Sequence, residues 1–168
     1  MLLIGQFVLG PGKLAMQITT GRLIDHAETI EALARLMQQQ WPDWYRDPAK
    51  ARGDLVSRLN DARLPLGLVV FANGRAAGAC ALTLSSGGLV TSRTPWVGGL
   101  LVDPAFRRRG LAAALLARAA EEAQLLGHER LYALTATAHE LFGSQGWQRI
   151  ENIELDGQAH AIYCAATS

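Results

Sequence analysis

Residues 96 to 112 decide the fold and read WVGGLLVDPAFRRRGLA. The first part, Trp96 to Val102, is an apolar run of strand length that an Asp-Pro pair interrupts. Three arginines follow, and then a glycine and small residues that are typical of a helix start. This order predicts a buried strand, a cationic turn and a helix over about 108–126, which Gly127 ends.

The arginine triplet, Arg107, Arg108 and Arg109, stands where a helix dipole already places partial positive charge and where the first amides lack acceptors. Three cations repel one another there unless an anion binds. Gly110 and Ala112 allow close backbone approach, so several amides can converge on a phosphate. The segment therefore predicts a pyrophosphate site, and a solvated basic turn is the alternative.

Two other phosphate-binding motifs are missing from the sequence. A P-loop needs GxxxxGK followed by Ser or Thr, and a dinucleotide-binding fold needs GxGxxG. Neither is present. The predicted pyrophosphate site, which we call the cradle, therefore belongs to neither of these two motifs.

Two helices are predicted upstream of the sheet. Asp25, followed by Glu28 three residues later, is typical of a capped helix start. Asp47 and Pro48 provide an N-cap and a first-turn proline for the next helix. The expected elements here are a strand over about 14–19 and helices that end near residues 40 and 59.

Apolar runs that flank turn-forming pairs predict the remaining strands. Asn73-Gly74 joins two runs as a tight antiparallel hairpin, and Asp156-Gly157 joins the last two. The whole order is β-α-α-β-β-β-α-β-α-β-β, which predicts an α/β (α+β) fold with a single mixed, mostly antiparallel sheet flanked by helices. The expected later elements are strands over 66–71, 76–84, 130–134, 147–154 and 158–165 and a short helix over 138–144.

Composition favours one intracellular domain. The chain has 168 residues, of which 49% are hydrophobic and 18% charged, and its net charge of +1 implies no bulk attraction to nucleic acid or to a membrane. Cys80 and Cys164 lie in apolar runs and are expected to be reduced core residues. No stretch approaches the roughly 20 apolar residues that span a bilayer. We expect a cytoplasmic protein with a domain over 14–168, and residues 1–13 as a flexible extension or a lead-in to the first strand.

The run Val102-Asp103-Pro104, followed by Arg107 to Ala112, resembles the acetyl-CoA signature of the GNAT superfamily of acyltransferases. That signature is a strand, an acidic or polar residue, Pro, and then [RQ]-x-x-G-x-[GA]. The element order over about 14–165 is also similar to that of the superfamily, and 140–147 (ELFGSQGW) looks like its short helix that ends in Gly-Phe or Gly-Trp. The resemblance implies transfer of an acetyl group from acetyl-CoA to a primary amine of a small molecule or peptide, by direct attack in a ternary complex and without a metal.

The resemblance also implies roles for individual residues. Amides of Arg108 to Ala113 would hold the pyrophosphate, the Leu100 amide would polarise the thioester carbonyl, and the Val102 backbone would align the pantetheine. The Gly98-Gly99 pair would allow two strands to splay, and a bulge or a tight contact within the strand is the alternative. The residues assigned to the cofactor are Leu100, Leu101, Val102, Arg107, Arg108, Arg109, Gly110, Leu111, Ala112, Ala113 and Phe142.

Phe142 departs from the family pattern. Many relatives carry a tyrosine there, whose hydroxyl protonates the departing thiolate, and phenylalanine cannot donate a proton. His139 and Tyr132 are the predicted catalytic substitutes, because histidine titrates near neutral pH. Unassisted departure of the thiolate is the alternative, and a solvated surface histidine is the other interpretation of His139. The general base is open among His26, Glu28, Asp43, Asp47 and water, and helix capping is the better interpretation of Glu28 and Asp47.

Aromatic residues predict the wall of the acceptor site. Trp44, Tyr45 and Trp96, with Trp41, could attract a cationic amine through their ring faces, although core packing is the commoner fate of tryptophan. A rival function is an acyl-CoA-binding sensor without turnover, which Phe142 favours. A homodimer is one of the arrangements that the sequence permits.

Overall fold

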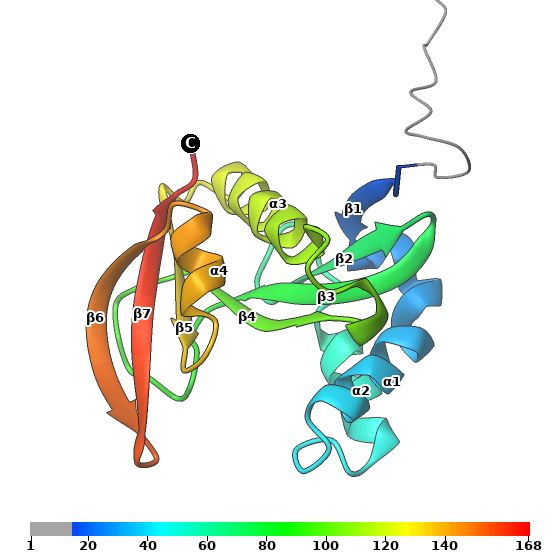
Figure 1. Cartoon of the computed structure of the whole chain (residues 1–168), viewed down its shortest axis with the longest axis horizontal. Helices are drawn as coiled ribbons and strands as arrows, with labels where there is room; N and C mark the ends of the chain where they lie inside the picture. The colour runs from blue at the N-terminus through cyan, green and yellow to red at the C-terminus, as the bar shows by residue number, and fades with distance from the viewer. Residues whose placement is uncertain (1–14) are drawn as a thin grey trace, which may run out of the picture.

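The predicted strands form one seven-stranded sheet in a computed structural model that describes residues 15–168 (Figure 1). The predicted extension over 1–13, and Leu14, lie outside the described residues. The strands are β1 (Ile18–Arg22), β2 (Leu66–Ala72), β3 (Arg75–Thr83), β4 (Trp96–Val102), β5 (Arg130–Thr135), β6 (Gln148–Leu155) and β7 (Gln158–Ala166). The helices are α1 (Ile30–Gln40), α2 (Pro48–Ser57), α3 (Leu111–Leu125) and α4 (His139–Ser144), with 3₁₀ turns at Leu23–Thr29 and Pro104–Phe106.

The sheet has the order β1-β2-β3-β4-β5-β7-β6, and β4 with β5 is its one parallel pair within residues 15–168. A parallel pair needs a crossover, which α3 supplies. Only two residue pairs join these strands, Trp96 with Tyr132 and Val97 with Ala133. Beyond them the strands diverge, so that β5, β6, β7 and α4 form one arm of a V and β1 to β4 with α1 and α2 form the other (Figure 1). The predicted mixed, mostly antiparallel fold is confirmed.

Helices cover both faces of the sheet. The larger hydrophobic cluster packs α3 and α4 on one face, with Leu115 and Phe142 buried in it. The smaller cluster packs α1 and α2 on the opposite face, through residues such as Met37 and Leu55. Small side chains of α3, such as Ala119, let that helix lie close to the strands.

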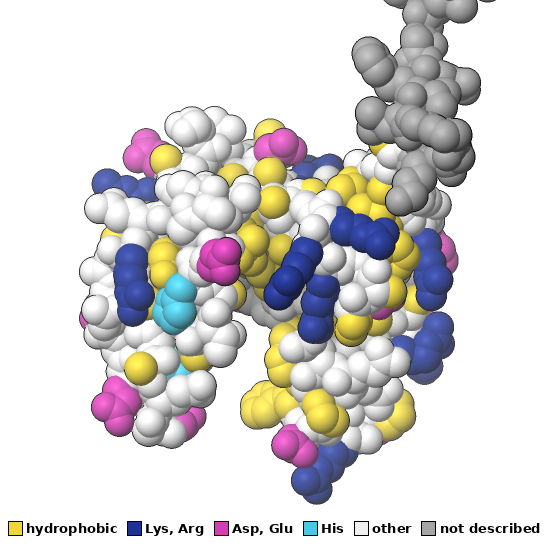
Figure 2. Space-filling view, in the orientation of Figure 1, with side chains coloured by type: hydrophobic (Ala, Val, Ile, Leu, Met, Phe, Trp, Pro, Cys, Tyr) yellow, Lys and Arg dark blue, Asp and Glu magenta, His cyan; other side chains and the backbone are white. Residues whose placement is uncertain are grey.

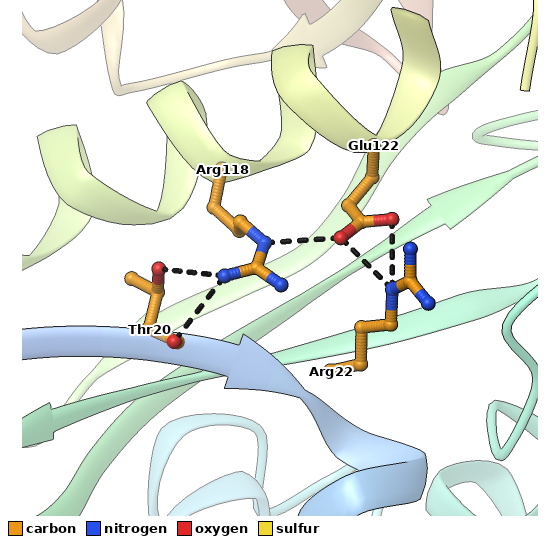
Figure 3. Close-up of polar contacts among 4 residues, drawn as sticks. All are labelled: Thr20, Arg22, Arg118 and Glu122. Atoms are coloured by element: carbon orange, nitrogen blue, oxygen red, sulfur yellow. Dashed lines mark hydrogen bonds and ion pairs between the residues drawn. The ribbon is translucent and has the colours of Figure 1, made fainter. Parts of the chain in front are cut away.

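Glu122 anchors α3 to the first strand. Its carboxylate is buried, accepts from Arg22 Nε at 2.9 Å and Arg118 Nε at 3.0 Å, and Arg118 also reaches the carbonyl oxygen of Thr20 at 3.3 Å (Figure 3). The hydrogen bond and the charge of Glu122 raise the pKa of Arg22. A buried carboxylate is tolerated here because two guanidinium groups pair with it.

Turn positions agree closely with the local sequence signals. Asn73 and Gly74 have φ angles of +50° and +80°, and Asp156 and Gly157 have +52° and +75°, as tight hairpin turns require. Gly127, at φ +89°, follows α3, where His128 N donates to Ala123 O at 2.9 Å. Asp47 caps α2 by accepting from Ala49 N at 2.9 Å, although that helix ends at Ser57 rather than near 59.

Two helix starts differ from the prediction. Asp25 and Glu28 do not cap α1, because they lie in the 3₁₀ turn, whose His26 is non-helical at φ −138°. Leu23 and Thr29 are buried and fix that turn, so α1 begins at Ile30 and β1 extends to Arg22. The helix α3 also begins later than predicted, at Leu111 rather than at about residue 108. Arg108 at φ +61° and Gly110 at φ +89° are left-handed and cannot join a right-handed helix.

Candidate active site

The segment predicted to form the phosphate cradle lies at the N-terminus of α3. Gly110 is the N-cap, and no atom lies within 4 Å of the position that a Cβ would take there. The first intrahelical hydrogen bond runs from Ala114 N to Gly110 O at 3.0 Å, so the amides of residues 111–113 have no acceptor within the helix. A cavity of about 350 Å³ opens at this end, lined by Val102, Phe106, Arg107, Arg108, Gly110, Leu111, Ala112, Ala113, Leu141 and Gln145.

Arg107 and Arg108 line this cavity, Arg109 follows them in the chain, and none of the three has a carboxylate partner within residues 15–168. Arg107 donates to Gln40 Oε1 at 2.6 Å and to Val102 O at 3.3 Å, which ties the turn to the end of α1. All three arginines are exposed, and basic side chains gather where the start of α3 meets the sheet (Figure 2). Outward amides, a helix dipole and unpaired cations together favour a polyanion such as a pyrophosphate.

A β-bulge interrupts β4 next to this cradle. Ala79 of β3 faces Leu101 and Ala81 faces Gly98, so that Gly99 and Leu100 together stand opposite one residue. Gly99 has a φ of +59°, which glycine adopts without strain. Pairing with β5 ends at Val97, so the two interpretations of the glycine pair, splay and bulge, are both correct.

A second cavity of about 360 Å³ fills the fork between β4 and β5. The hollow between the two arms is visible in Figure 2. On β4, Leu100 lines this cavity and Val102 lines the cavity at the cradle. On α4, Phe142 lines this cavity and Leu141 lines the one at the cradle. The two cavities therefore adjoin. The lining of the fork is Gln40, Trp41, Ser86, Gly87, Val97–Leu100, Leu134–Ala138, Phe142 and His160.

The two predicted catalytic side chains lie outside the lining of the fork. His139 Nε2 is 3.0 Å from Ala136 O and its Nδ1 is 3.0 Å from the Tyr163 hydroxyl. Because a carbonyl oxygen only accepts, Nε2 carries a proton, and Nδ1 accepts from the tyrosine when the ring is neutral. Tyr132 packs on Trp96 with ring centroids 5.5 Å apart and lines a separate cavity of about 810 Å³. The structure thus does not bring either side chain to Leu100.

Phe142 itself lines the fork and is otherwise buried. Its ring stacks on Tyr163 at 5.3 Å and meets Trp147 edge-on at 5.0 Å. Phenylalanine carries no hydroxyl, so this residue adds an apolar side chain to the lining of the fork.

His160 is the titratable side chain that sequence reasoning missed. Its Nδ1 lies 2.9 Å from Gln158 O, so Nδ1 donates, and the neutral ring keeps an unshared pair on Nε2. The β5–β7 register pairs Thr135 with Ala161, which brings His160 to the fork. Only that register, which joins distant segments, could have revealed it.

Of the aromatic residues that were predicted for the acceptor site, Trp41 lines the fork. Trp44 is 65% exposed and lies under Lys50, whose Nζ is 3.8 Å from the ring centroid. Tyr45 is buried and donates to Asp54 Oδ2 at 2.7 Å, and burial raises the pKa of Tyr45 to about 12. Trp96 is fully buried and donates from Nε1 to Arg93 O. These three do not line the fork.

Other chemistry-bearing groups lie apart from the fork. Cys80 is buried, which raises the pKa of its thiol to about 12, and Cys164 is half-buried; both are free thiols. Within residues 15–168, no three His, Cys, Asp or Glu side chains are placed to hold a metal ion. None of the described helices is long and apolar enough to cross a membrane.

Comparison with known proteins identifies relatives of this arrangement. The sequence profile of the acetyltransferase (GNAT) family matches residues 30–147. No curated protein sequence is significantly similar to the chain.

Solved structures resemble the whole described fold. An acetyltransferase of the GNAT family from Bacillus cereus is 15% identical with a TM-score of 0.66, over 90% of this chain and 97% of that one. An aminoglycoside 6'-N-acetyltransferase complexed with coenzyme A is 10% identical with a TM-score of 0.72, over 89% and 97%. The N-acetylglutamate synthase of Neisseria gonorrhoeae, complexed with coenzyme A and N-acetyl-glutamate, is 22% identical with a TM-score of 0.62, over 93% of this chain and 36% of that one.

Proposed function

The chain belongs to the acetyltransferase (GNAT) family, and we propose that it is an acetyl-CoA-dependent N-acetyltransferase that acts on a primary amine of a small molecule or peptide. The observation that carries this proposal is the junction of the cradle at α3 with the bulged, unpaired stretch of β4. The predicted phosphate site and the fork lie end to end at this junction. Together the two cavities suit a long cosubstrate with a pyrophosphate at one end and an acyl group at the other.

The cradle residues bind and orient the donor. Amides of Leu111, Ala112 and Ala113 would hold the pyrophosphate, with Arg107, Arg108 and Arg109 adding charge. Acetyl-CoA supplies an acetyl group activated as a thioester. The β4 backbone from Leu100 to Val102, which is not paired with β5, would align the rest of the cosubstrate. The Leu100 amide would donate to the carbonyl oxygen at which negative charge develops.

His160 would serve the acceptor amine as general base. His160 lines the same cavity as Leu100, and in the neutral ring its Nε2 would take the proton that the amine loses. For the thiolate, the two residues predicted from sequence, His139 and Tyr132, lie away from the fork. We propose instead that the thiolate leaves without a side-chain acid, since Phe142 stands where that acid would be.

The test is acetyl-CoA binding by isothermal titration calorimetry with Gly110→Asp. A carboxylate in the cradle repels phosphate, so we expect affinity to fall about tenfold or more. Gly74→Asp is the matched control, because Gly74 has a similar φ of +80°, equally open space around its Cβ position, and a place in a remote hairpin. Equal affinity of Gly110→Asp and wild type would refute the cradle.

A sensor that binds acyl-CoA without turnover is the second candidate, because Phe142 cannot protonate a thiolate. Release of free CoA in the presence of amines separates the two functions. A transferase releases CoA only when acetyl-CoA and an acceptor are both present. A sensor binds acetyl-CoA as tightly and releases none over a broad amine panel.

A further inference from the structure

Arg58, the residue that follows α2, carries a positive charge without a counter-ion among residues 15–168. Its Nη1 is sealed from solvent and has no hydrogen-bond partner in that part of the chain. The ion pairs of residues 15–168 are all made by other cations. Asp54, one helical turn earlier, accepts instead from the Tyr45 hydroxyl at 2.7 Å. A buried, unpaired guanidinium nitrogen is costly, which indicates a partner that is not part of the described chain.

The backbone of Arg58 is fixed at the edge of β2. Its carbonyl oxygen accepts from Gly67 N at 2.9 Å, and its Cβ lies 3.0 Å from the position that a Cβ on Gly67 would take. The guanidinium reaches β4, where Nη1 and Nη2 lie 3.2 and 3.3 Å from the corresponding position on Gly99. Gly67 pairs with Ala81 and Ala81 with Gly98, so small residues on three adjacent strands leave a path for the side chain.

The side chain therefore ends behind the bulge, one glycine away from the fork, and Arg58 is not itself among the residues that line the fork. Gly99 lines the fork together with Gln40 and Trp41, which come from the α1 side of the sheet. Within residues 15–168, the lining of the fork contains no aspartate or glutamate. A carboxylate that enters from this side approaches an uncompensated cation across Gly99 and no like charge, whereas an acceptor with several positive charges finds no partner.

We propose that Arg58 binds a carboxylate of the acceptor, so that the acceptor is an amino acid or another amine with a carboxylate near its amino group. This inference rests on the proposed acetyl transfer, because it concerns what enters the fork beside Leu100. Arg58 would then set specificity, with a planar guanidinium that matches a carboxylate in a paired geometry.

The first test is CoA release with the twenty amino acids and their carboxamides as paired substrates. Wild type is expected to prefer the acid over its amide by at least about tenfold in kcat/KM, as one charge-assisted contact allows. Arg58→Gln should remove this preference by raising KM for the acid, and Arg58→Lys should restore part of it. Arg52→Gln is the control, because it removes the same charge from an exposed site on α2 where Arg52 pairs with Glu31.

The outcomes separate this inference from the proposed function. Equal use of acids and amides by wild type, or an equal loss for both in Arg58→Gln, would overturn the role of Arg58 while acetyl transfer stands. The acid–amide comparison in wild type needs no variant, so misfolding of Arg58→Gln leaves a decisive result. Acetyl-CoA binding without CoA release for any amine would instead count against the transferase.

Binding of products gives a readout that is independent of turnover. N-acetyl amino acids titrated into the CoA-loaded protein should bind wild type and lose about tenfold or more in Arg58→Gln. Equal affinities, or no binding to wild type, would overturn the inference.

Discussion

The hydrogen bonds of His139 and His160 separate the roles of these two side chains. His139 uses both ring nitrogens within the protein, one on Ala136 O and the other on the Tyr163 hydroxyl. His160 uses only Nδ1, on Gln158 O, and it lines the fork. A general base needs a free lone pair within reach of the amine, so the structure favours His160. His139 was predicted because it lies near Phe142 in sequence, whereas His160 comes close only through strand pairing.

His160→Gln should lower kcat/KM by about 100-fold, because glutamine keeps a hydrogen-bonding side chain but cannot take a proton near neutral pH. Acetyl-CoA affinity should stay unchanged, because His160 does not line the cradle. Steady-state CoA release measures the first effect and isothermal titration calorimetry the second. His139→Gln is the paired control, and a loss of kcat/KM in that variant alone would move the role to His139.

At the scale of single elements, local turn chemistry was predictable and packing was not. Asn73-Gly74, Asp47-Pro48 and Gly127 act within a few residues of themselves, so their predictions were confirmed. The predicted cap at Asp25 is wrong, because burial of Leu23 selects a 3₁₀ turn there. The left-handed Arg108 left no signal either, because arginine rarely adopts that conformation.

The attachment of α3 to β1 gives a stability prediction for one element. Glu122→Ala leaves Arg22 and Arg118 without their shared carboxylate, and it should lower the free energy of unfolding by about 1–3 kcal/mol. The loss stays moderate because both arginines are partly exposed. Urea unfolding measures it, with Glu121→Ala, exposed on the same helix, as the control. Equal losses in the two variants would mean that the anchor contributes nothing.

At the scale of the whole molecule, the order of elements could be predicted from sequence, and so could the position of the arginine turn before α3, because both depend on segments that are continuous in the chain. The residues around the fork could not. Trp41 and His160 line the fork with Leu100, and Arg58 lies behind Gly99; these residues come from separate segments that only the register of the sheet brings together. Trp44, Tyr45 and Trp96 were expected there on residue type alone, and exposure or core packing places them elsewhere.

A crystal structure of the protein with CoA tests the central claim most directly. We expect pyrophosphate oxygens about 3 Å from the amides of Leu111 to Ala113, and the sulfur in the fork beside Leu100 and Phe142. That arrangement would place the acetyl group between the β4 bulge and His160. A pyrophosphate bound away from the N-terminus of α3, or a sulfur outside the fork, would contradict the claim.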